Sequence, residues 1–389
     1  MKILLVANGY PTPRYPLQSF IGVLCEELTR QGHDVTVVAP QLMLSAWKHK
    51  MGFVPRYYEE KIHTSSANKV IKIYRPKIFA PSTGGRLGRV SRYLIKRRIC
   101  KTLNSIDSHF DVIYCHFWLS ATYVYQYAEK HNIPLIVATG EDVIYPSILG
   151  GNNTISSLQS IVKGVICVSS KNRKESIACN LTETEKCIVL PNSINSNVFH
   201  QIDKKKVREE LGYNQGDFIV AFCGRFNERK GVFRLEKAIE MCNDKTIKSI
   251  FIGRPIEGQS KIPKCEGILF CGTLPHSEVA KYLNAADVFV LPTLAEGCSN
   301  SIVEAMACGL PVISSDLAFN WDILDETNSI LVNPMNVDEI SNSIMKLKEN
   351  AHLRQSMSTS SLNKAKELTI ENRVKKIVEF IKNQTSSNI

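Results

Sequence analysis

The stretch LAEGCSNSIVEAMACGLPVISS, residues 294–315, decides the fold because it connects two strand-like runs through a loop and a helix. The apolar run 287–293 precedes it, and its own last residues, VISS, belong to another apolar run. Ser301 and Glu304 fit the S-x-x-E pattern of a capping box, which predicts a helix that begins near residue 301. A following glycine and proline predict where that helix ends. The stretch thus predicts one strand–loop–helix–strand unit of a parallel sheet.

The same alternation of apolar runs and longer amphipathic stretches extends along most of the chain. The strand-like runs are 2–7, 34–40, 111–116, 134–140, 164–170 and 187–193, then 218–224, 247–253, 267–272, 287–293 and 310–315. A polar, charged segment at 200–217 separates the two series. We therefore predict an α/β protein with two Rossmann-like, doubly wound domains, residues 1–200 and 201–370. An amphipathic helix is expected after them, at about 371–389.

The composition of the 389-residue chain excludes several classes of protein. No run of 18 uncharged apolar residues occurs, which argues against a transmembrane helix. The twelve cysteines form no C-x-x-C pair, and several lie inside apolar runs, which indicates a reducing compartment such as the cytosol. The first strand-like run is followed by ANGYPTPRYPLQSF, without the G-x-G-x-x-G fingerprint of a dinucleotide-binding enzyme.

The net charge of +11 is concentrated in one region. Residues 61–101 contain twelve Lys or Arg and no Asp or Glu, so the rest of the chain is close to neutral. Within this region, segment 84–101 has Leu87, Val90 and Leu94 at helical spacing with cations between them, which predicts a basic amphipathic helix that lies on anionic lipid. A solvated basic face is the alternative. Binding of nucleic acid is disfavoured, because one aromatic residue stands among the cations and no nucleic-acid motif is present.

Two glutamates of the opening stretch, Glu296 and Glu304, are candidates for ligand contacts. Glu296 stands on the loop after a strand, at the carboxyl end where doubly wound folds place their ligands. The helix that follows offers free backbone N–H groups to an anion. Carboxylates repel a bare phosphate but accept hydrogen bonds from hydroxyls, so the pattern favours a diphosphate joined to a group rich in hydroxyls. For Glu304 two roles stay open, a capping-box residue and a ligand contact.

The segment GRFNERKG, residues 224–231, follows another strand-like run and places three cations on one loop. Arg225 and Arg229 offer planar guanidinium groups to phosphate oxygens, and Lys230 offers a compact charge. A solvated basic loop is the alternative interpretation. Because this loop and Glu296 both follow strands of the same predicted sheet, we expect them to lie at the same edge.

Together these motifs resemble the retaining glycosyltransferases of family 4, which have the GT-B fold. The resemblance rests on the two glutamates in the spacing E-x7-E and on G-R-x4-K-G before them. It extends to the Tyr-Pro loop after the first strand, DVIYCHF (111–117), GED (140–142), PNSIN (191–195) and the C-terminal helix. It implies two Rossmann-like domains that face a cleft, with the last helix crossing back to the first domain.

The resemblance also implies a role for each matching residue of the second domain, which binds a nucleoside-diphosphate sugar. Arg225 and Lys230 neutralise the diphosphate leaving group, Glu296 contacts hydroxyls of the transferred sugar and Glu304 contacts the ribose. Gly224 belongs to the same donor site. Backbone N–H groups of Ser299, Asn300 and Ser301 hold phosphate oxygens, and the base lies near Gly272 and Leu274. The reaction retains the anomeric configuration, and neither a metal nor another cofactor is expected.

In the first domain the resemblance implies an acceptor site. His116 matches a family position near the donor sugar and acceptor, with a packed histidine as the alternative. Gln18, Ser19 and Asp142 are the candidate acceptor contacts. The chain departs from the family here: 139–142 is TGED where a histidine usually begins the segment, 192–195 is NSIN rather than NGVD, and the glycine-rich acceptor loop is PLQSF (16–20).

We therefore expect a glycosyltransferase that moves a hexose from a nucleoside-diphosphate sugar to a glycan or lipid-linked acceptor in cell-surface polysaccharide or glycolipid synthesis. The expected location is the cytoplasm, peripheral on the cytoplasmic face of the membrane through segment 84–101. One alternative is a soluble enzyme with a small-molecule acceptor. Another is a non-catalytic protein that binds a nucleotide sugar or nucleic acid, although no nucleic-acid partner is expected.

Overall fold

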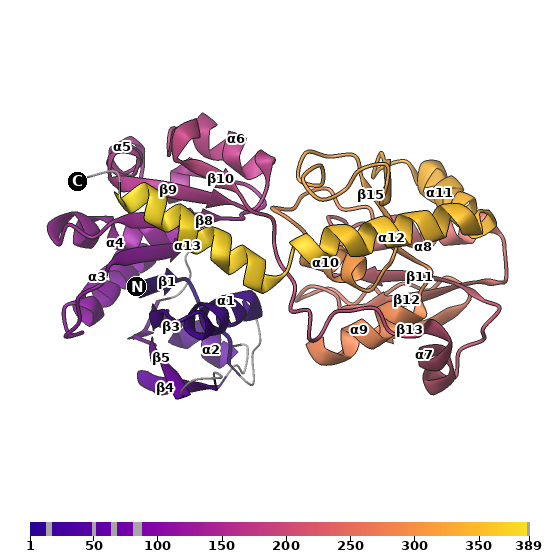
Figure 1. Cartoon of the computed structure of the whole chain (residues 1–389), viewed down its shortest axis with the longest axis horizontal. Coiled ribbons are helices and arrows are strands. Elements are labelled where there is room, and N and C mark those ends of the chain that lie inside the picture. Colours follow the sequence, from indigo (N-terminus) through magenta and orange to yellow (C-terminus); the bar gives the residue numbers. More distant parts are fainter. Residues whose placement is uncertain (13–17, 49–51, 64–67, 81–87, 387–389) are drawn as a thin grey trace. The chain divides into compact units, whose positions relative to one another are not determined.

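The computed structural model describes residues 1–12, 18–48, 52–63, 68–80 and 88–386, and the chain divides into two compact units (Figure 1). The first unit comprises residues 1–168, 172–190 and the chain from residue 373. The second comprises residues 169–171 and 191–372. The division after residue 190 lies ten residues before the boundary that the sequence suggested.

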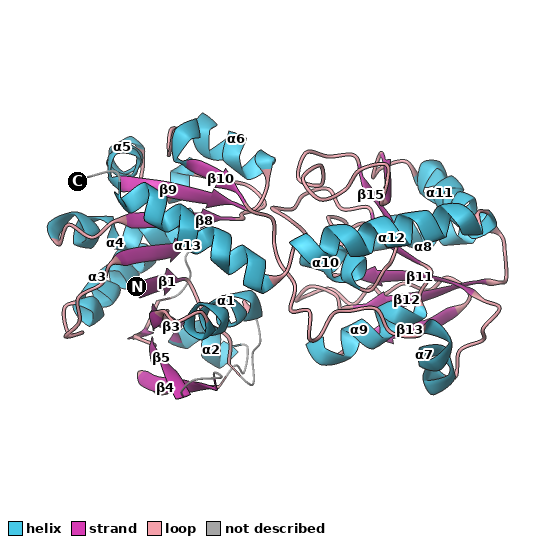
Figure 2. Ribbon diagram, in the orientation of Figure 1, coloured by secondary structure: helices cyan, strands magenta, loops and turns pink. Residues whose placement is uncertain are grey.

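The first unit is built on an eight-stranded sheet in the order β10-β9-β8-β7-β1-β2-β5-β4, in which only β4 runs antiparallel to its neighbour (Figure 2). A separate two-stranded sheet pairs β3 with β6. The strands of this unit are β1 (Lys2–Ala7), β2 (Asp34–Val38), β3 (Gln41–Leu42), β4 (Tyr57–His63), β5 (Asn68–Tyr74), β6 (Lys77–Ile78), β7 (Val112–His116), β8 (Leu135–Thr139), β9 (Val162–Cys167) and β10 (Cys187–Val189).

Helices cover both faces of this sheet. They are α1 (Ser19–Arg30), α2 (Met43–Lys48), α3 (Gly88–Leu103), α4 (Trp118–Lys130), α5 (Asn152–Ile161), α6 (Ser170–Ala178) and α13 (Ile370–Ser386). One face packs on α3, α4 and α5, with Ile113, Val137 and Trp118 fully buried between the layers. On the other face α13 lies close over β9, because a Cβ added at Gly164 would lie 2.8 Å from the ring of Phe380.

The basic segment forms helix α3 as predicted, but its buried face is not the predicted one. Ser91, Ile95 and Ile99 face the core, whereas Val90 is 55% exposed. Leu87, the first member of the predicted apolar face, lies outside the described residues, as does the segment 84–87. The prediction was wrong because it placed Val90 and Leu94 on the buried face, whereas the helix buries Ser91 and Ile95, each one residue later. In the described residues, no helix is long and apolar enough to cross a membrane.

The second unit has a six-stranded, fully parallel sheet in the order β13-β12-β11-β14-β15-β16. Its strands are β11 (Phe218–Cys223), β12 (Ile247–Ile252), β13 (Ile268–Gly272), β14 (Val288–Leu291), β15 (Val312–Ser315) and β16 (Ser329–Val332). Its helices are α7 (Lys204–Leu211), α8 (Val232–Cys242), α9 (His276–Ala285), α10 (Asn300–Ala307), α11 (Val337–Glu349) and α12 (Ala351–Glu367). A doubly wound sheet in each unit confirms the predicted fold class.

Each sheet reverses its strand order at one point, between β1 and β7 in the first unit and between β11 and β14 in the second. At such a point the loops after the two central strands diverge to opposite faces and leave a crevice at the carboxyl edge, where doubly wound folds bind ligands. His116 ends β7, and the loop 224–231 follows β11. His116 and the cations of the loop 224–231 therefore belong to these two switch points.

In the second unit the two loops at the switch point are held together by a close backbone approach. Gly231 has a left-handed backbone with φ +77°, and a Cβ there would lie 2.3 Å from the carbonyl oxygen of Pro292. The buried guanidinium of Arg234 donates to the same carbonyl at 2.8 Å and to that of Glu228 at 2.9 Å. These contacts fix the loop after β11 against the loop after β14.

Replacing Gly231 by alanine is expected to lower the free energy of unfolding by about 3 kcal/mol, because strain in the left-handed region adds to a backbone clash. Gly212→Ala is the matched control, since that glycine has φ +70° but no atom within 4 Å of the added Cβ. It should cost only about 1 kcal/mol. Urea unfolding of both variants measures the difference, and equal losses would show that the close approach contributes nothing.

Candidate functional site

The loop 224–231 is anchored at both ends, which fixes the cations between them. The ring of Phe226 is 1% exposed, and its amide donates to the carbonyl of Arg254 at 2.9 Å. Near the other end the side chain of Asn227 accepts a hydrogen bond from the Lys230 amide at 2.9 Å. The guanidinium of Arg225 is half-buried and pairs with no other described side chain. It is thus available to an anion at the switch point.

Glu296 is buried in the loop after β14 and is held by the cations of the other loop. Its carboxylate accepts a hydrogen bond from the ammonium of Lys230 and another from the Thr293 hydroxyl at 2.9 Å. Arg229 lies 3.8 Å away and donates to the carbonyl of Ala295 at 2.6 Å. The structure therefore brings Glu296 and Lys230 together, 66 residues apart in sequence, as the shared switch point predicts.

The predicted capping box at the start of α10 is not formed. The helix begins at Asn300 with Ser299 as its N-cap, and no side chain caps it. The hydroxyls of Ser299 and Ser301 lie 3.1 Å apart, and the Glu304 carboxylate turns away from Ser301. Because the helix starts earlier than the S-x-x-E spacing requires, Glu304 falls beyond the third helical position. The first N–H groups of α10 thus stay without a side-chain cap, beside Glu296.

Glu304 instead contacts His276, at the start of α9. The imidazole Nε2 lies 2.9 Å from the carboxylate, and this hydrogen bond raises the pKa of His276 above its ordinary value. Its ring also meets Phe199 edge-on at 5.0 Å. The sequence prediction missed His276. Its position at the beginning of the helix after β13, where the base was expected, is the signal that points to it.

Charge from both loops reaches the thiol of Cys223 at the end of β11. Burial and the negative charge of Glu304 raise the pKa of Cys223 to about 12, and the positive charge of Lys230 opposes this shift. Glu304 and Lys230 therefore act on one point of the sheet edge. Gly224 follows directly, so four predicted donor-site residues, namely Gly224, Lys230, Glu296 and Glu304, belong to the carboxyl edge around β11 and β14.

The predicted base position lies at the end of the edge strand β13, which β12 separates from β11. Gly272 ends this strand, and its carbonyl accepts a hydrogen bond from the Gly253 amide at 2.7 Å. Leu274 follows and is half-buried. Two residues later His276 starts α9 and contacts Glu304. The segment thus offers backbone groups and an apolar side chain next to the predicted ribose contact.

In the first unit His116 lies at the switch point and is half-buried. Both ring nitrogens are buried and have no hydrogen-bond partner among the described residues. Burial, with the nearby charge of Arg373, lowers the pKa of His116 to about 3. The ring packs against Phe117 at 4.2 Å and Phe20 at 5.0 Å. A neutral imidazole here can donate one hydrogen bond and accept another, but it carries no second ring proton to give as a general acid near neutral pH.

The three predicted acceptor contacts are placed differently. Gln18 precedes α1 with φ 65°. Its side chain lies over Gly9, so a Cβ added at Gly9 would lie 2.7 Å from Gln18 Oε1. That oxygen is buried without a partner in the described structure. Ser19 is the half-buried first residue of α1, and Asp142 is exposed three residues after β8. Pro16 and Leu17, in the same loop as Gln18, lie outside the described residues.

The carboxylate next to Asp142 has a structural role that the sequence did not reveal. Glu141 accepts hydrogen bonds from the Trp118 amide at 2.9 Å, the Thr139 hydroxyl at 2.6 Å and the Gly140 amide at 2.9 Å. Burial raises its pKa, although these hydrogen bonds oppose the shift. Glu141 thereby holds the beginning of α4 against the end of β8 and fixes the loop that carries Asp142.

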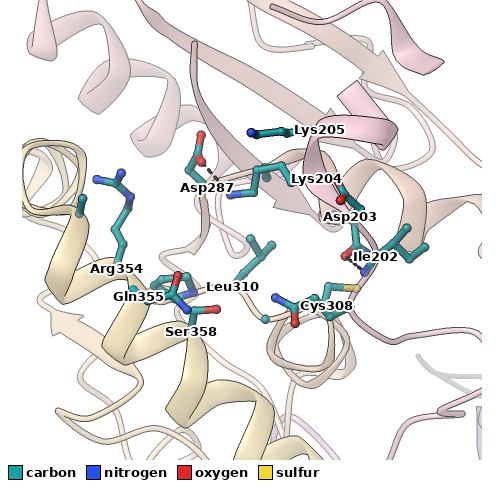
Figure 3. A pocket seen from close by; sticks show the side chains of 16 residues that line it. Ile202, Asp203, Lys204, Lys205, Asp287, Cys308, Leu310, Arg354, Gln355 and Ser358 are labelled. Carbon is teal, nitrogen blue, oxygen red and sulfur yellow. Dashed lines mark hydrogen bonds and ion pairs between the residues drawn. The ribbon is translucent and has the colours of Figure 1, made fainter. Parts of the chain in front are cut away.

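A hollow in the second unit lies away from the carboxyl edge that carries Glu296 and Lys230 (Figure 3). It has a volume of about 680 Å³ and is lined by residues that precede strands, such as Asp287 before β14 and Pro311 before β15. Asp287 is paired with Lys204 at 2.8 Å and with Arg208 at 2.7 Å. The hollow lies at the amino edge of the sheet, opposite the predicted donor site, and its paired charges make it a structural feature.

Comparison with known proteins agrees with the fold and the motifs. Residues 217–350 match the family model described as glycosyl transferases group 1, and residues 17–198 match that of glycosyltransferase family 4. A putative teichuronic acid biosynthesis glycosyltransferase, TuaC of Bacillus subtilis, is 28% identical over 360 residues, covering 88% of each chain. A phosphatidyl-myo-inositol mannosyltransferase of Propionibacterium freudenreichii is 23% identical, covering 78% of this chain and 74% of the relative.

Solved structures share the fold at low sequence identity. Sucrose-phosphate synthase from Thermosynechococcus elongatus superposes with a TM-score of 0.76 at 16% identity, over 100% of both chains. HepE of Anabaena, in complex with UDP-glucose, gives a TM-score of 0.72 at 15% identity, over 98% of this chain and 100% of that one.

The pKa of His276 is expected to fall when Glu304 is replaced by glutamine, because the carboxylate that stabilises the imidazolium is lost. Histidine ring NMR titration measures the change. Glu296→Gln is the control, since Glu296 makes its contacts with Lys230 and Thr293 and should leave the His276 titration in place. An unchanged pKa in Glu304→Gln would contradict the contact.

The neutral, buried state of His116 predicts a pH-dependent stability. Its pKa near 3 in the folded chain lies below the unfolded value of about 6.5, so the unfolded state binds the extra proton between those values. This contribution to the free energy of unfolding is complete above about pH 6.5 and declines by about 1.4 kcal/mol per pH unit below it. Urea unfolding between pH 7 and pH 5 should show that the free energy of unfolding falls less steeply with decreasing pH in His116→Gln than in the parent. The same pH dependence in both would contradict a neutral His116.

Proposed function

Because the chain belongs to the family 4-like glycosyltransferases with the GT-B fold, we propose that it transfers a hexose from a nucleoside-diphosphate sugar with retention of the anomeric configuration. The observation that carries this proposal is the pairing of Lys230 with buried Glu296 at the switch point, with Arg225 on the same loop. Cations, an uncapped helix start and buried carboxylates at one sheet edge match a donor that combines a diphosphate with sugar hydroxyls.

In the proposed donor complex, Arg225 and Lys230 bind the diphosphate together with the backbone N–H groups of Ser299, Asn300 and Ser301. Negative charge builds on this diphosphate as the bond to the sugar breaks, so cations fixed in place lower the barrier. Glu296 accepts hydrogen bonds from hydroxyls of the transferred sugar. Its contact with Lys230 keeps both side chains in place for these roles.

The nucleoside part of the donor is proposed to lie along the edge from α10 to β13. Glu304 accepts from the ribose hydroxyls, a role that its present contact with His276 leaves open on its second oxygen. The base lies near Gly272 and Leu274, where backbone groups recognise it. The proposed reaction uses no metal and no other cofactor, since fixed cations neutralise the leaving group.

The acceptor is proposed to be a glycan or lipid-linked sugar that binds the first unit. Gln18, with its buried unpartnered oxygen, and Ser19 would orient it, together with Asp142. His116 stays neutral and would donate one hydrogen bond to the sugar or acceptor. A relative named for teichuronic acid synthesis and another named for phosphatidyl-myo-inositol support a role in cell-surface polysaccharide or glycolipid synthesis.

The proposed location is the cytoplasm, with peripheral attachment to the cytoplasmic membrane face. Twelve cysteines that are all free agree with a reducing compartment. The basic helix α3 supplies the positive charge that anionic lipids attract. A lipid-linked acceptor held at that surface would then be close to the unit that binds it.

Arg225→Ala is expected to lower donor turnover about a hundredfold without loss of stability, because this guanidinium has no partner in the described structure but would contact the leaving group. Lys237→Ala on α8 is the matched control, an exposed lysine six residues from the loop, and should keep the parent rate. Lys230→Ala should also lose activity, and its melting temperature shows how much of the loss comes from leaving Glu296 unpaired.

The donor for this assay is the UDP-, GDP- or ADP-sugar that raises the melting temperature of the chain most, since a ligand of the folded state stabilises it. NMR of the product then gives its anomeric configuration. Parent activity in both Arg225→Ala and Lys230→Ala would overturn the site, and an inverted product would overturn the proposed retention.

A further inference from the structure

A groove in the first unit lies on the outer side of helices α3 and α4, at the beginning of α5. Its volume is about 620 Å³. From α3 it is lined by three cations, Arg89, Arg92 and Lys96, and from α4 by Tyr123 and Tyr125. The spacing of the cations, three and four residues apart, places them on one side of the helix. Among the residues that the structure describes, no acidic side chain lines the groove, and its charged side chains are all positive.

The hydroxyl of Tyr123 is the second sign of a ligand. The side chain lines the groove yet is only 3% exposed, and its hydroxyl has no hydrogen-bond partner among the described residues. A buried hydroxyl without a partner is unfavourable for folding, and most such groups in proteins are satisfied. The positive charge of Arg92 acts on the same hydroxyl. An anionic oxygen that enters the groove beside Arg92 would supply the missing partner.

The beginning of α5 adds backbone donors to the same groove. Gly150 and Gly151 line it, with φ +104° and +82°, and Gly151 is the N-cap of a ten-residue helix without a side-chain cap. A Cβ at Gly151 would meet no atom within 4 Å, so the backbone is open there. The start of a helix carries partial positive charge and attracts anions. Three independent features thus favour one negatively charged, oxygen-rich group.

The rim of the groove is apolar and exposed, which distinguishes a lipid from a soluble anion. Tyr93 is 62% exposed and Ile148 is 37% exposed, and both line the groove. Val90, one turn before Leu94 on α3, is 55% exposed. Lys96 lies 4.7 Å from the ring centre of Tyr125, and its pKa is lowered by burial, so a phosphate would compensate a charge that the fold desolvates. Apolar side chains around a cationic hollow suit the boundary between headgroups and acyl chains.

We propose that this groove binds the phosphate group of a membrane phospholipid, with Arg89, Lys96 and the Tyr123 hydroxyl as ligands and the Tyr93 side chain in the interface. The inference rests on the proposed peripheral attachment and deepens it, from general attraction between charges to one defined headgroup site. It does not involve the donor site, so the two can fail separately.

The test is co-sedimentation of the full chain with vesicles of phosphatidylcholine that contain phosphatidylglycerol. Arg89→Ala/Lys96→Ala is compared with Arg97→Ala/Arg98→Ala, which removes two charges from the same helix outside the groove. The first pair should weaken binding about tenfold more than the second. Tyr123→Phe changes no charge, should not lower the melting temperature, and should weaken binding about tenfold through loss of one hydrogen bond to a charged group.

Glycerol 3-phosphate, matched in ionic strength by sodium chloride, is the soluble competitor. The headgroup site is supported if glycerol 3-phosphate displaces the parent chain from vesicles but does not displace Tyr123→Phe. If both double variants lose the same amount of vesicle binding and Tyr123→Phe binds as well as the parent, the headgroup site is wrong and the attraction to the membrane is a general effect of charge. If the parent does not bind vesicles, both the headgroup site and the proposed membrane attachment are wrong. Unchanged donor turnover in all groove variants would show that this result leaves the proposed transferase site unaffected.

Discussion

The candidate site depends on one backbone constraint, the close approach of the loops after β11 and β14. Gly231 allows the Pro292 carbonyl to come within the space that any side chain would occupy, and Arg234 ties both loops to the same point. Only because these loops meet can Lys230 reach Glu296. A buried carboxylate is costly unless it is paired and hydrogen-bonded, so the ion pair in turn requires this loop geometry. The order of the strands, the contact between the two loops and the ion pair of Lys230 with Glu296 therefore depend on one another.

Both carboxylates at this edge have a side-chain partner. Glu296 is neutralised by Lys230, and Glu304 has His276 beside it. A diphosphate that enters must attract Lys230 without leaving Glu296 as a buried, unpaired charge. Sugar hydroxyls that donate to Glu296 satisfy this requirement, and a bare phosphate does not. The arrangement consequently favours an anion that carries a hydroxyl-rich group on it, an argument for a sugar nucleotide that is independent of family resemblance.

Much of the fold could be predicted from the sequence because its central strands are buried on both faces and appear as continuous apolar runs. Strand β4 was missed since it lies at the sheet edge and alternates exposed positions, such as Glu59, with half-buried ones, such as Glu60. The pairing of Glu296 with a cation of the 224–231 loop follows from topology alone. The capping-box prediction was wrong because it started α10 near Ser301, whereas the helix begins at Asn300. The predicted apolar face of α3 was wrong because Val90 and Ile95 are equally apolar, and the sequence alone does not tell which of them packs on the core.

The two switch points differ in their electrostatics, and this difference supports the proposed division of roles. At β7 the polar groups are neutral or already hydrogen-bonded: His116 is a neutral imidazole near neutral pH, and the Glu141 carboxylate accepts hydrogen bonds from backbone and hydroxyl donors. At β11 and β14 the groups are charged, and Arg225 has no partner in the described structure. A departing diphosphate needs fixed positive charge, whereas an acceptor hydroxyl needs orientation by neutral hydrogen-bonding groups. In the proposed reaction, stabilisation of the leaving group would therefore belong to the second unit, and the neutral groups of the first unit would suit an acceptor hydroxyl.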